Sequence, residues 1–123
     1  MISLLLVEHP PLVRRALVAH LGLESDLLVL AETGHASEAV RLAEALHPDV
    51  VLLDAEMPNL DVSTTVRRLR ARSPSSRIVL LSLYSSAAAG AFDGEIPFIV
   101  SKHEGTGALL ATIRDVAGRP HAD

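Results

Sequence analysis

An uninterrupted apolar run, Val50–Leu53, is followed at once by the carboxylate of Asp54 and shortly afterwards by Pro58. A short run of this kind predicts a β-strand that is buried on both faces, as in a parallel sheet. Asp54 is then at the carboxyl end of that strand, where ligands bind and chemistry takes place in open parallel sheets. Asp54 is therefore the first candidate functional residue.

Short apolar runs alternate with amphipathic stretches along the whole chain. The runs predict five strands, at Leu4–Val7, Leu27–Ala31, Val50–Asp54, Ile78–Ser82 and Phe98–Val100. The segments between them carry apolar residues at three- or four-residue spacing, which predicts helices with one buried face. This repeated βα order predicts a three-layer α/β fold, a doubly wound parallel five-stranded sheet with helices on both faces.

Composition and charge narrow the class of protein. The 123 residues fit one domain, and an apolar content of 49% is enough for one core. The absence of cysteine excludes a disulfide framework and a thiolate nucleophile, and we expect a cytoplasmic protein. The first strand has no basic segment before it, which argues against a signal peptide or a membrane span. A net charge of −4 without a basic cluster argues against direct binding of nucleic acid.

Polar residues follow the strands that are expected to lie side by side. Glu8 and His9 follow the first strand, Asp54 and Ser82 end the third and fourth strands, and Lys102 follows the fifth. If these four strands are neighbours, their carboxyl ends meet at one edge of the sheet. We therefore expect carboxylates, a hydroxyl and an ammonium to share one shallow pocket.

These residues and their surroundings resemble a known family. The stretches Leu5–Arg15, Pro48–Pro58 and Ile78–Ser82, followed by Lys102, are similar in order and spacing to bacterial response-regulator receiver domains of two-component systems, the CheY-like superfamily. The chain most resembles the NarL/FixJ/LuxR-like subgroup, in which a helix-turn-helix DNA-binding domain follows the receiver.

The resemblance implies an organisation for the chain. It implies the strand order 2-1-3-4-5, with the helices after strands one and five on one face and the other three helices on the opposite face. It also implies a receiver domain over residues 1–118 and, at residues 119–123, the start of a linker to an output domain. The implied partners are a sensor histidine kinase and that helix-turn-helix output domain.

The resemblance also implies a role for three residues. Asp54 matches the phosphoacceptor, which takes a phosphoryl group from a histidine kinase or a small phosphodonor. Ser82 matches the switch hydroxyl, and Lys102 matches the lysine that pairs with the phosphoryl oxygens. A phosphoryl group adds about −1.5 to −2 charges and three acceptor oxygens, so a hydroxyl and a cation beside it are chemically sensible. The alternative for Asp54 is a strand-end residue that only hydrogen-bonds the following turn.

The acidic pair of the family is degraded in this chain. Receivers carry two acids after the first strand, where this sequence has Glu8 and His9. Mg²⁺ requires hard oxygen ligands, so an imidazole in this place predicts weak binding, with Asp54, Glu8 and the backbone carbonyl of Glu56 as the remaining ligands. No cofactor is certain, and weakly bound Mg²⁺ is the one candidate.

His9 itself allows three interpretations. In the first, the residue has drifted because the site no longer needs an acid. In the second, the imidazole is a transition-metal ligand beside Asp54. In the third, the protonated ring replaces part of the positive charge of the metal. The second and third interpretations would make the pocket responsive to ions or to pH.

Two further departures concern the last part of the sheet. The segment Tyr84–Glu95 contains Gly90 and Gly94, which predict a short or frayed fourth helix. Ile99 stands where the family has its switch aromatic, and strand alternation directs the neighbouring Phe98 to the opposite side.

Enzyme functions fit the sequence poorly. No glycine-rich phosphate loop follows the first strand. Asp54 and Glu56 are similar to the aspartyl pair of haloacid-dehalogenase-type phosphatases, but in that family the pair follows the first strand rather than the third. We expect no catalytic residue and no enzyme activity.

Two functions remain, and they differ in class. One is an atypical receiver that controls an attached DNA-binding domain with weak or no Mg²⁺-dependent phosphorylation, as a constitutive dimerisation or small-ligand-sensing module. The alternative is a conventional receiver, switched by phosphotransfer from a histidine kinase to Asp54. The degraded acidic pair and the missing aromatic favour the atypical receiver.

A homodimer is expected, since receivers that lose regulated phosphorylation still need a paired state to present two DNA-reading domains to a two-fold operator. The last helix is the expected contributor, because about half of its apolar residues would face the sheet and the others would need a partner. These residues are Leu109, Leu110, Ile113 and Val116.

Overall fold

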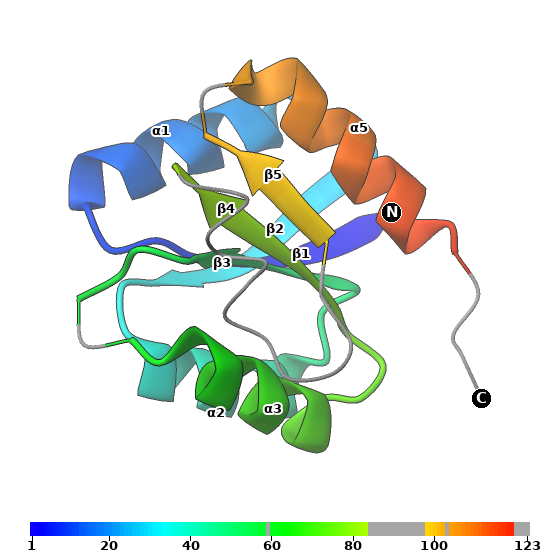
Figure 1. Ribbon diagram of the computed structural model, residues 1–123. Helices are drawn as coiled ribbons and strands as arrows, with labels where there is room; N and C mark the ends of the chain where they lie inside the picture. Colours follow the sequence, from blue (N-terminus) through cyan, green and yellow to red (C-terminus); the bar gives the residue numbers. More distant parts are fainter. Residues whose placement is uncertain (59, 84–97, 103, 120–123) are drawn as a thin grey trace.

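A computed structural model of the chain describes residues 1–58, 60–83, 98–102 and 104–119. Five parallel strands form one sheet in the order β2-β1-β3-β4-β5, which confirms the predicted fold (Figure 1). The strands are β1 (Ile2–Val7), β2 (Leu27–Thr33), β3 (Val50–Asp54), β4 (Arg77–Ser82) and β5 (Phe98–Ser101). The helices are α1 (Pro11–Gly22), α2 (Ala36–Leu46), α3 (Val62–Arg72) and α5 (Gly105–Ala117). The expected fourth helix lies outside the described residues.

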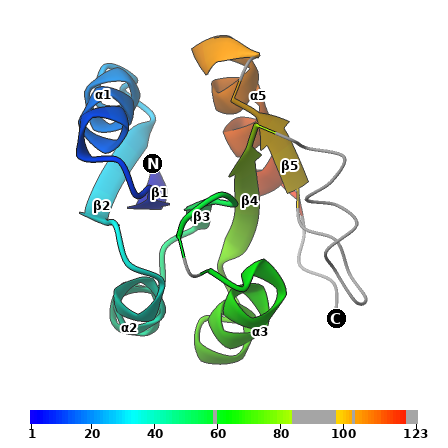
Figure 2. The same cartoon turned by 60° about the vertical axis from the view of Figure 1, so that its left-hand side comes forward.

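The helices cover the sheet on both faces. Helices α1 and α5 lie on one face, and α2 and α3 lie on the other, as Figures 1 and 2 show. Strand alternation supplies each face with its own aliphatic layer: Leu4 and Leu6 pack on the α1 and α5 side, and Leu5 and Val7 pack on the α2 and α3 side. The run Val50–Leu53 is completely buried, because β3 has a neighbouring strand on each side and a helix layer on each face.

Helix α5 corrects one prediction. Leu109, Ile113 and Val116 are all buried in the core beneath it, and Leu110 packs partly buried against the same core. The expectation that this helix leaves a surplus apolar side for a partner is therefore wrong. The reason is geometric: Leu109, Ile113 and Val116 are spaced by four and three residues, so they lie on a single face of the helix.

Exposed apolar residues lie on α1 instead. Leu21 is the only buried residue of this helix, and Leu12 is 79% exposed. Ala16 and Ala19 are exposed as well, as is Leu23, which caps the end of the helix. These four residues, Leu12, Ala16, Ala19 and Leu23, follow helical spacing, and we call them the α1 stripe. None of the described helices is long and apolar enough to cross a membrane.

Candidate functional site

The carboxyl ends of four strands meet at one edge of the sheet. Val7 pairs with Leu53, which places Glu8 beside Asp54. Asp54 pairs with Leu81, and Ser82 pairs with Ser101, which is the residue before Lys102. The strand register therefore brings together the residues that the sequence placed at this edge, Glu8, Asp54, Ser82 and Lys102.

Lys102 connects the two buried carboxylates of the site. Its ammonium nitrogen Nζ lies 2.7 Å from Oδ1 of Asp54 and 3.1 Å from Oε1 of Glu8. The side chain of Asp54 is 3% exposed and that of Glu8 is 1% exposed. A third carboxylate oxygen, Oε1 of Glu56, lies 3.8 Å from the same nitrogen. One ammonium thus faces three carboxylates.

Burial and neighbouring charges shift the pKa values of Glu8, Asp54 and Lys102. Burial and the neighbouring charge of Asp54 raise the pKa of Glu8 to about 7, although the ammonium of Lys102 opposes the rise. Burial also acts to raise the pKa of Asp54, but hydrogen bonds from Lys102 and from the backbone of Glu56 outweigh it and hold that pKa below its usual value. For Lys102, burial acts to lower the pKa, but the bond to Asp54 and the charge of Glu8 raise it overall. The site therefore holds an ionised Asp54 and a charged Lys102 at neutral pH, and Glu8 binds a proton much more readily than an ordinary carboxylate.

Glu56 folds back over the edge of the sheet. Its backbone N–H donates to Oδ1 of Asp54 at 3.0 Å, which closes a tight turn after β3. Its side chain then accepts a hydrogen bond from Oγ of Ser82 at 2.7 Å and another from the backbone N–H of Leu83 at 2.8 Å. The carboxylate of Glu56 therefore bonds the hydroxyl that the family resemblance assigns to a phosphoryl oxygen.

The sequence had assigned only the backbone carbonyl of Glu56 to the site. The role of its side chain was missed, although one signal was available: an acid two residues beyond Asp54 lies opposite the hydroxyl at the end of the neighbouring strand.

His9 lies apart from the buried cluster. Its side chain is exposed and lines a surface hollow together with Met57 and Asp61. The guanidinium of Arg14 donates to the backbone carbonyls of Glu8 at 2.9 Å and His9 at 3.3 Å, which fixes the chain in this turn.

The site residues do not fit Mg²⁺. The ion requires near-octahedral coordination by oxygen atoms. One oxygen each of Asp54 and Glu8 already binds the ammonium of Lys102, and His9, an exposed imidazole, stands where the family has a second acid. In the part of the chain that the structure describes, no three His, Cys, Asp or Glu residues are grouped so as to hold a metal ion.

The end of the site at β5 follows the alternation of the strand. Ile99 packs against the core on the α2 and α3 side. Phe98 is 37% exposed, and the guanidinium of Arg119 lies 4.9 Å from the centre of its ring. The two side chains thus point to opposite sides, as the sequence predicted.

Comparison with known proteins agrees with this architecture. The chain is 33% identical to the DNA-binding transcriptional activator DevR/DosR of Mycobacterium tuberculosis over 127 aligned positions, which cover 100% of the chain and 58% of that protein. It is 33% identical to the nitrate/nitrite response regulator protein NarL of Escherichia coli over 81 positions, which cover 66% of the chain and 38% of that protein. The chain thus spans less than two thirds of the length of these relatives.

A solved structure and a family match complete the comparison. The structure of a two-component response regulator of the LuxR family from Aurantimonas sp. SI85-9A1 superimposes with a TM-score of 0.84. The two chains are 28% identical, and the superposition covers 95% of this chain and 86% of that one. Residues 4–114 match the family described as the response regulator receiver domain. The parallel sheet, the residues gathered at its carboxyl edge and these matches agree, and the chain belongs to the response regulator receiver domain family.

Proposed function

We propose that this chain is an atypical receiver that controls an attached DNA-binding domain and accepts little or no phosphoryl group at Asp54 in the presence of Mg²⁺. The observation that carries the proposal is the position of Glu56. Its carboxylate accepts the hydrogen bonds of the Ser82 hydroxyl and of the Leu83 N–H, the donors that a phosphoryl group on Asp54 would need.

Electrostatics supports the same proposal. An incoming phosphoryl group would bring further negative charge to a site in which Glu8, Asp54 and Glu56 already surround the ammonium of Lys102. A divalent cation would offset this repulsion, but His9 offers an imidazole in the place of a carboxylate that Mg²⁺ would prefer. Phosphotransfer to Asp54 is thus opposed both by the bound carboxylate and by the net charge.

The relatives suggest what the receiver controls. One of them is a DNA-binding transcriptional activator, and the chain covers only part of its length. We propose that residues 1–118 form the receiver domain and that residues 119–123 begin a linker to a helix-turn-helix output domain. The proposed upstream partner is a sensor histidine kinase. The role of the receiver is regulatory rather than catalytic, in the cytoplasm.

The proposal includes a homodimer, since a two-fold operator requires two output domains. The α1 stripe, rather than α5, is the exposed apolar surface among the described helices that such a contact would cover. Light scattering should give twice the monomer mass, and Leu12→Asp should return the chain to a monomer. A wild-type monomer would contradict this part of the proposal.

The phosphorylation state of Asp54 tests the main proposal. The chain is incubated with acetyl phosphate and Mg²⁺ and then separated on a phosphate-affinity gel. We expect little retarded protein for the wild type and a large increase for the double variant His9→Asp, Glu56→Ala, which frees the Ser82 hydroxyl and restores an acid. Adding Asp54→Asn to the double variant should abolish the retarded band.

A matched control is Glu44→Ala, which removes an exposed carboxylate of α2 and should behave like the wild type. Extensive phosphorylation of the wild type, lost in Asp54→Asn, would overturn the proposal and establish the conventional receiver.

A further inference from the structure

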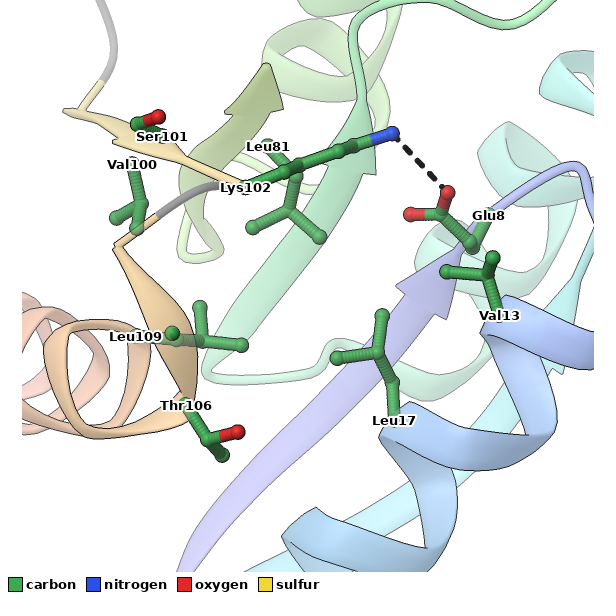
Figure 3. A pocket seen from close by; sticks show the side chains of 10 residues that line it. Glu8, Val13, Leu17, Leu81, Val100, Ser101, Lys102, Thr106 and Leu109 are labelled. Atoms are coloured by element: carbon green, nitrogen blue, oxygen red, sulfur yellow. Dashed lines mark hydrogen bonds and ion pairs between the residues drawn. The ribbon is translucent and has the colours of Figure 1, made fainter. Parts of the chain in front are cut away.

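A small cavity lies between α1 and α5, beside the end of β1 and beneath Lys102 (Figure 3). It has a volume of about 150 Å³. Its walls are mostly apolar, with Val13 and Leu17 from α1, Leu81 from β4, Val100 from β5 and Leu109 from α5. A cavity of this size and lining holds a molecule about as large as benzene.

The polar end of the cavity is the carboxylate of Glu8. One oxygen, Oε1, accepts the hydrogen bond of Lys102. The other, Oε2, is buried and receives no hydrogen bond from the described residues. Figure 3 shows this oxygen beneath the Lys102 side chain, on the side of the carboxylate that faces Leu81. A buried carboxylate oxygen without a donor is costly, and this cost is seen in the raised pKa of Glu8. Above that pKa, where Glu8 is ionised, a donor from a ligand would be favoured.

The charge around Glu8 selects the kind of donor. Glu8, Asp54 and Glu56 surround the single ammonium of Lys102, which leaves an excess of negative charge. The nearest guanidinium, that of Arg14, donates to the backbone carbonyl of Glu8 and not to its carboxylate. A cationic donor therefore complements the site better than a neutral one, and an anion would be repelled.

We propose that this cavity binds a small primary amine with a branched alkyl or benzyl body. The ammonium of the ligand donates to Oε2 of Glu8, and its apolar body contacts Leu17, Leu81 and Leu109. The site goes beyond the proposed function, because it uses Oε2 of Glu8, the oxygen that does not bind Lys102. Amine binding does not depend on whether Asp54 is phosphorylated. Occupancy would nevertheless be linked to the Lys102–Asp54 pair, since both cations would share one carboxylate.

Titration calorimetry with 3-methylbutylamine tests the proposal directly, at constant ionic strength and at about pH 8.5, where Glu8 is ionised and an alkylamine is still protonated. Two analogues serve as controls: 3-methylbutanol keeps the body without the charge, and methylamine keeps the charge without the body. We expect saturable binding of 3-methylbutylamine with one site per chain, and binding at least about tenfold weaker for both controls, as expected for the loss of one charged hydrogen bond or of the apolar contact. Equal binding of the alcohol, or no binding of the amine, would overturn the proposal.

Variants place the ligand in the cavity. Glu8→Gln removes the charge but keeps the shape of the side chain, and it should weaken the amine at least about tenfold. Val13→Phe should block the cavity while leaving Glu8 in place; Val13 is 43% exposed, so the larger ring is tolerated by the fold. The matched control is Glu44→Gln on the surface of α2, which should bind the amine like the wild type. Binding that survives Glu8→Gln and Val13→Phe would place the amine elsewhere and refute the assignment.

Discussion

Two groups of charged side chains lie at opposite ends of the sheet, and burial distinguishes them. At the carboxyl end, Lys102 bridges Asp54 and Glu8, whose side chains are 3% and 1% exposed. At the amino end, Arg114 of α5 bonds Asp26 at 2.8 Å and Glu24 at 2.9 Å, and these carboxylates are 46% and 32% exposed.

The difference in burial changes what the same kind of ion pair does. The exposed charges of the Arg114 cluster keep much of their hydration, so water and salt screen their attraction. The buried carboxylates of the Lys102 cluster have lost most of their hydration and depend on Lys102 instead. As a result, the pKa of Glu8 is raised and that of Asp54 is lowered. Ion pairs at the amino end connect α5 to the loop before β2. Those at the carboxyl end shift the pKa values of Glu8 and Asp54.

The largest effect should follow removal of the central cation. Lys102→Met leaves Asp54 and Glu8 buried side by side without a partner, and we expect it to lower the free energy of unfolding by about 3 kcal/mol, as for a broken buried pair. Urea denaturation monitored by circular dichroism measures the change. Lys102→Arg keeps the charge and should lose clearly less. Equal free energies of unfolding for Lys102→Met and the wild type would contradict the claim that the buried carboxylates depend on their cation.

A smaller effect should appear in the dependence of stability on pH. The pKa of Glu8 is raised from 4.5 to about 7 in the folded chain, so between these values the folded state binds a proton that the unfolded chain has released. The free energy of unfolding should therefore fall as the pH rises from about 4.5 to 7, and then level off. Glu8→Gln should remove this component, so that its stability relative to the wild type increases with pH.

Glu24→Gln is the matched control for this measurement, because Glu24 belongs to the exposed cluster. It should keep the pH profile of the wild type. A profile for Glu8→Gln that parallels the wild type from pH 5 to 8 would contradict the raised pKa of Glu8.

The smallest effect should come from the amino end. Arg114→Met removes the exposed ion pairs, and we expect a loss of stability well below that of Lys102→Met. Repeating the denaturation in high salt should shrink the effect of Arg114→Met further and leave that of Lys102→Met nearly unchanged, because salt screens exposed charges far more than buried ones. An equal response of both variants to salt would remove the distinction between the clusters.

Much of the fold could be predicted because its determinants are local. The runs from Leu4 to Val7 and from Val50 to Leu53 are apolar on both sides of the strand, and both lie fully buried at the centre of the sheet. The meeting of Asp54 with Lys102 also followed, since the residues at the ends of neighbouring parallel strands must share one edge.

The orientation of side chains could not be predicted in the same way. The placement of the Glu56 carboxylate depends on the turn after Asp54 and on two donors that lie 26 and 27 residues further along the chain. On α5, spacing alone already places Leu109, Ile113 and Val116 on one face, whereas the partial burial of Leu110 depends on how the helix lies on β4 and β5. Such three-dimensional choices leave little trace in spacing alone.

The turn that brings Glu56 onto the Ser82 hydroxyl makes it a ligand tethered within the chain. A tethered ligand has an effective concentration fixed by the length of its tether, so neither dilution nor the level of any cellular metabolite can lower it. An external anion would bind only the fraction of molecules in which Glu56 has swung away; if that fraction were about one tenth, the apparent affinity would fall about tenfold. The affinity of the carboxyl edge of the sheet for external anions is thus set by the chain itself, and substitution of Glu56 alone would change it.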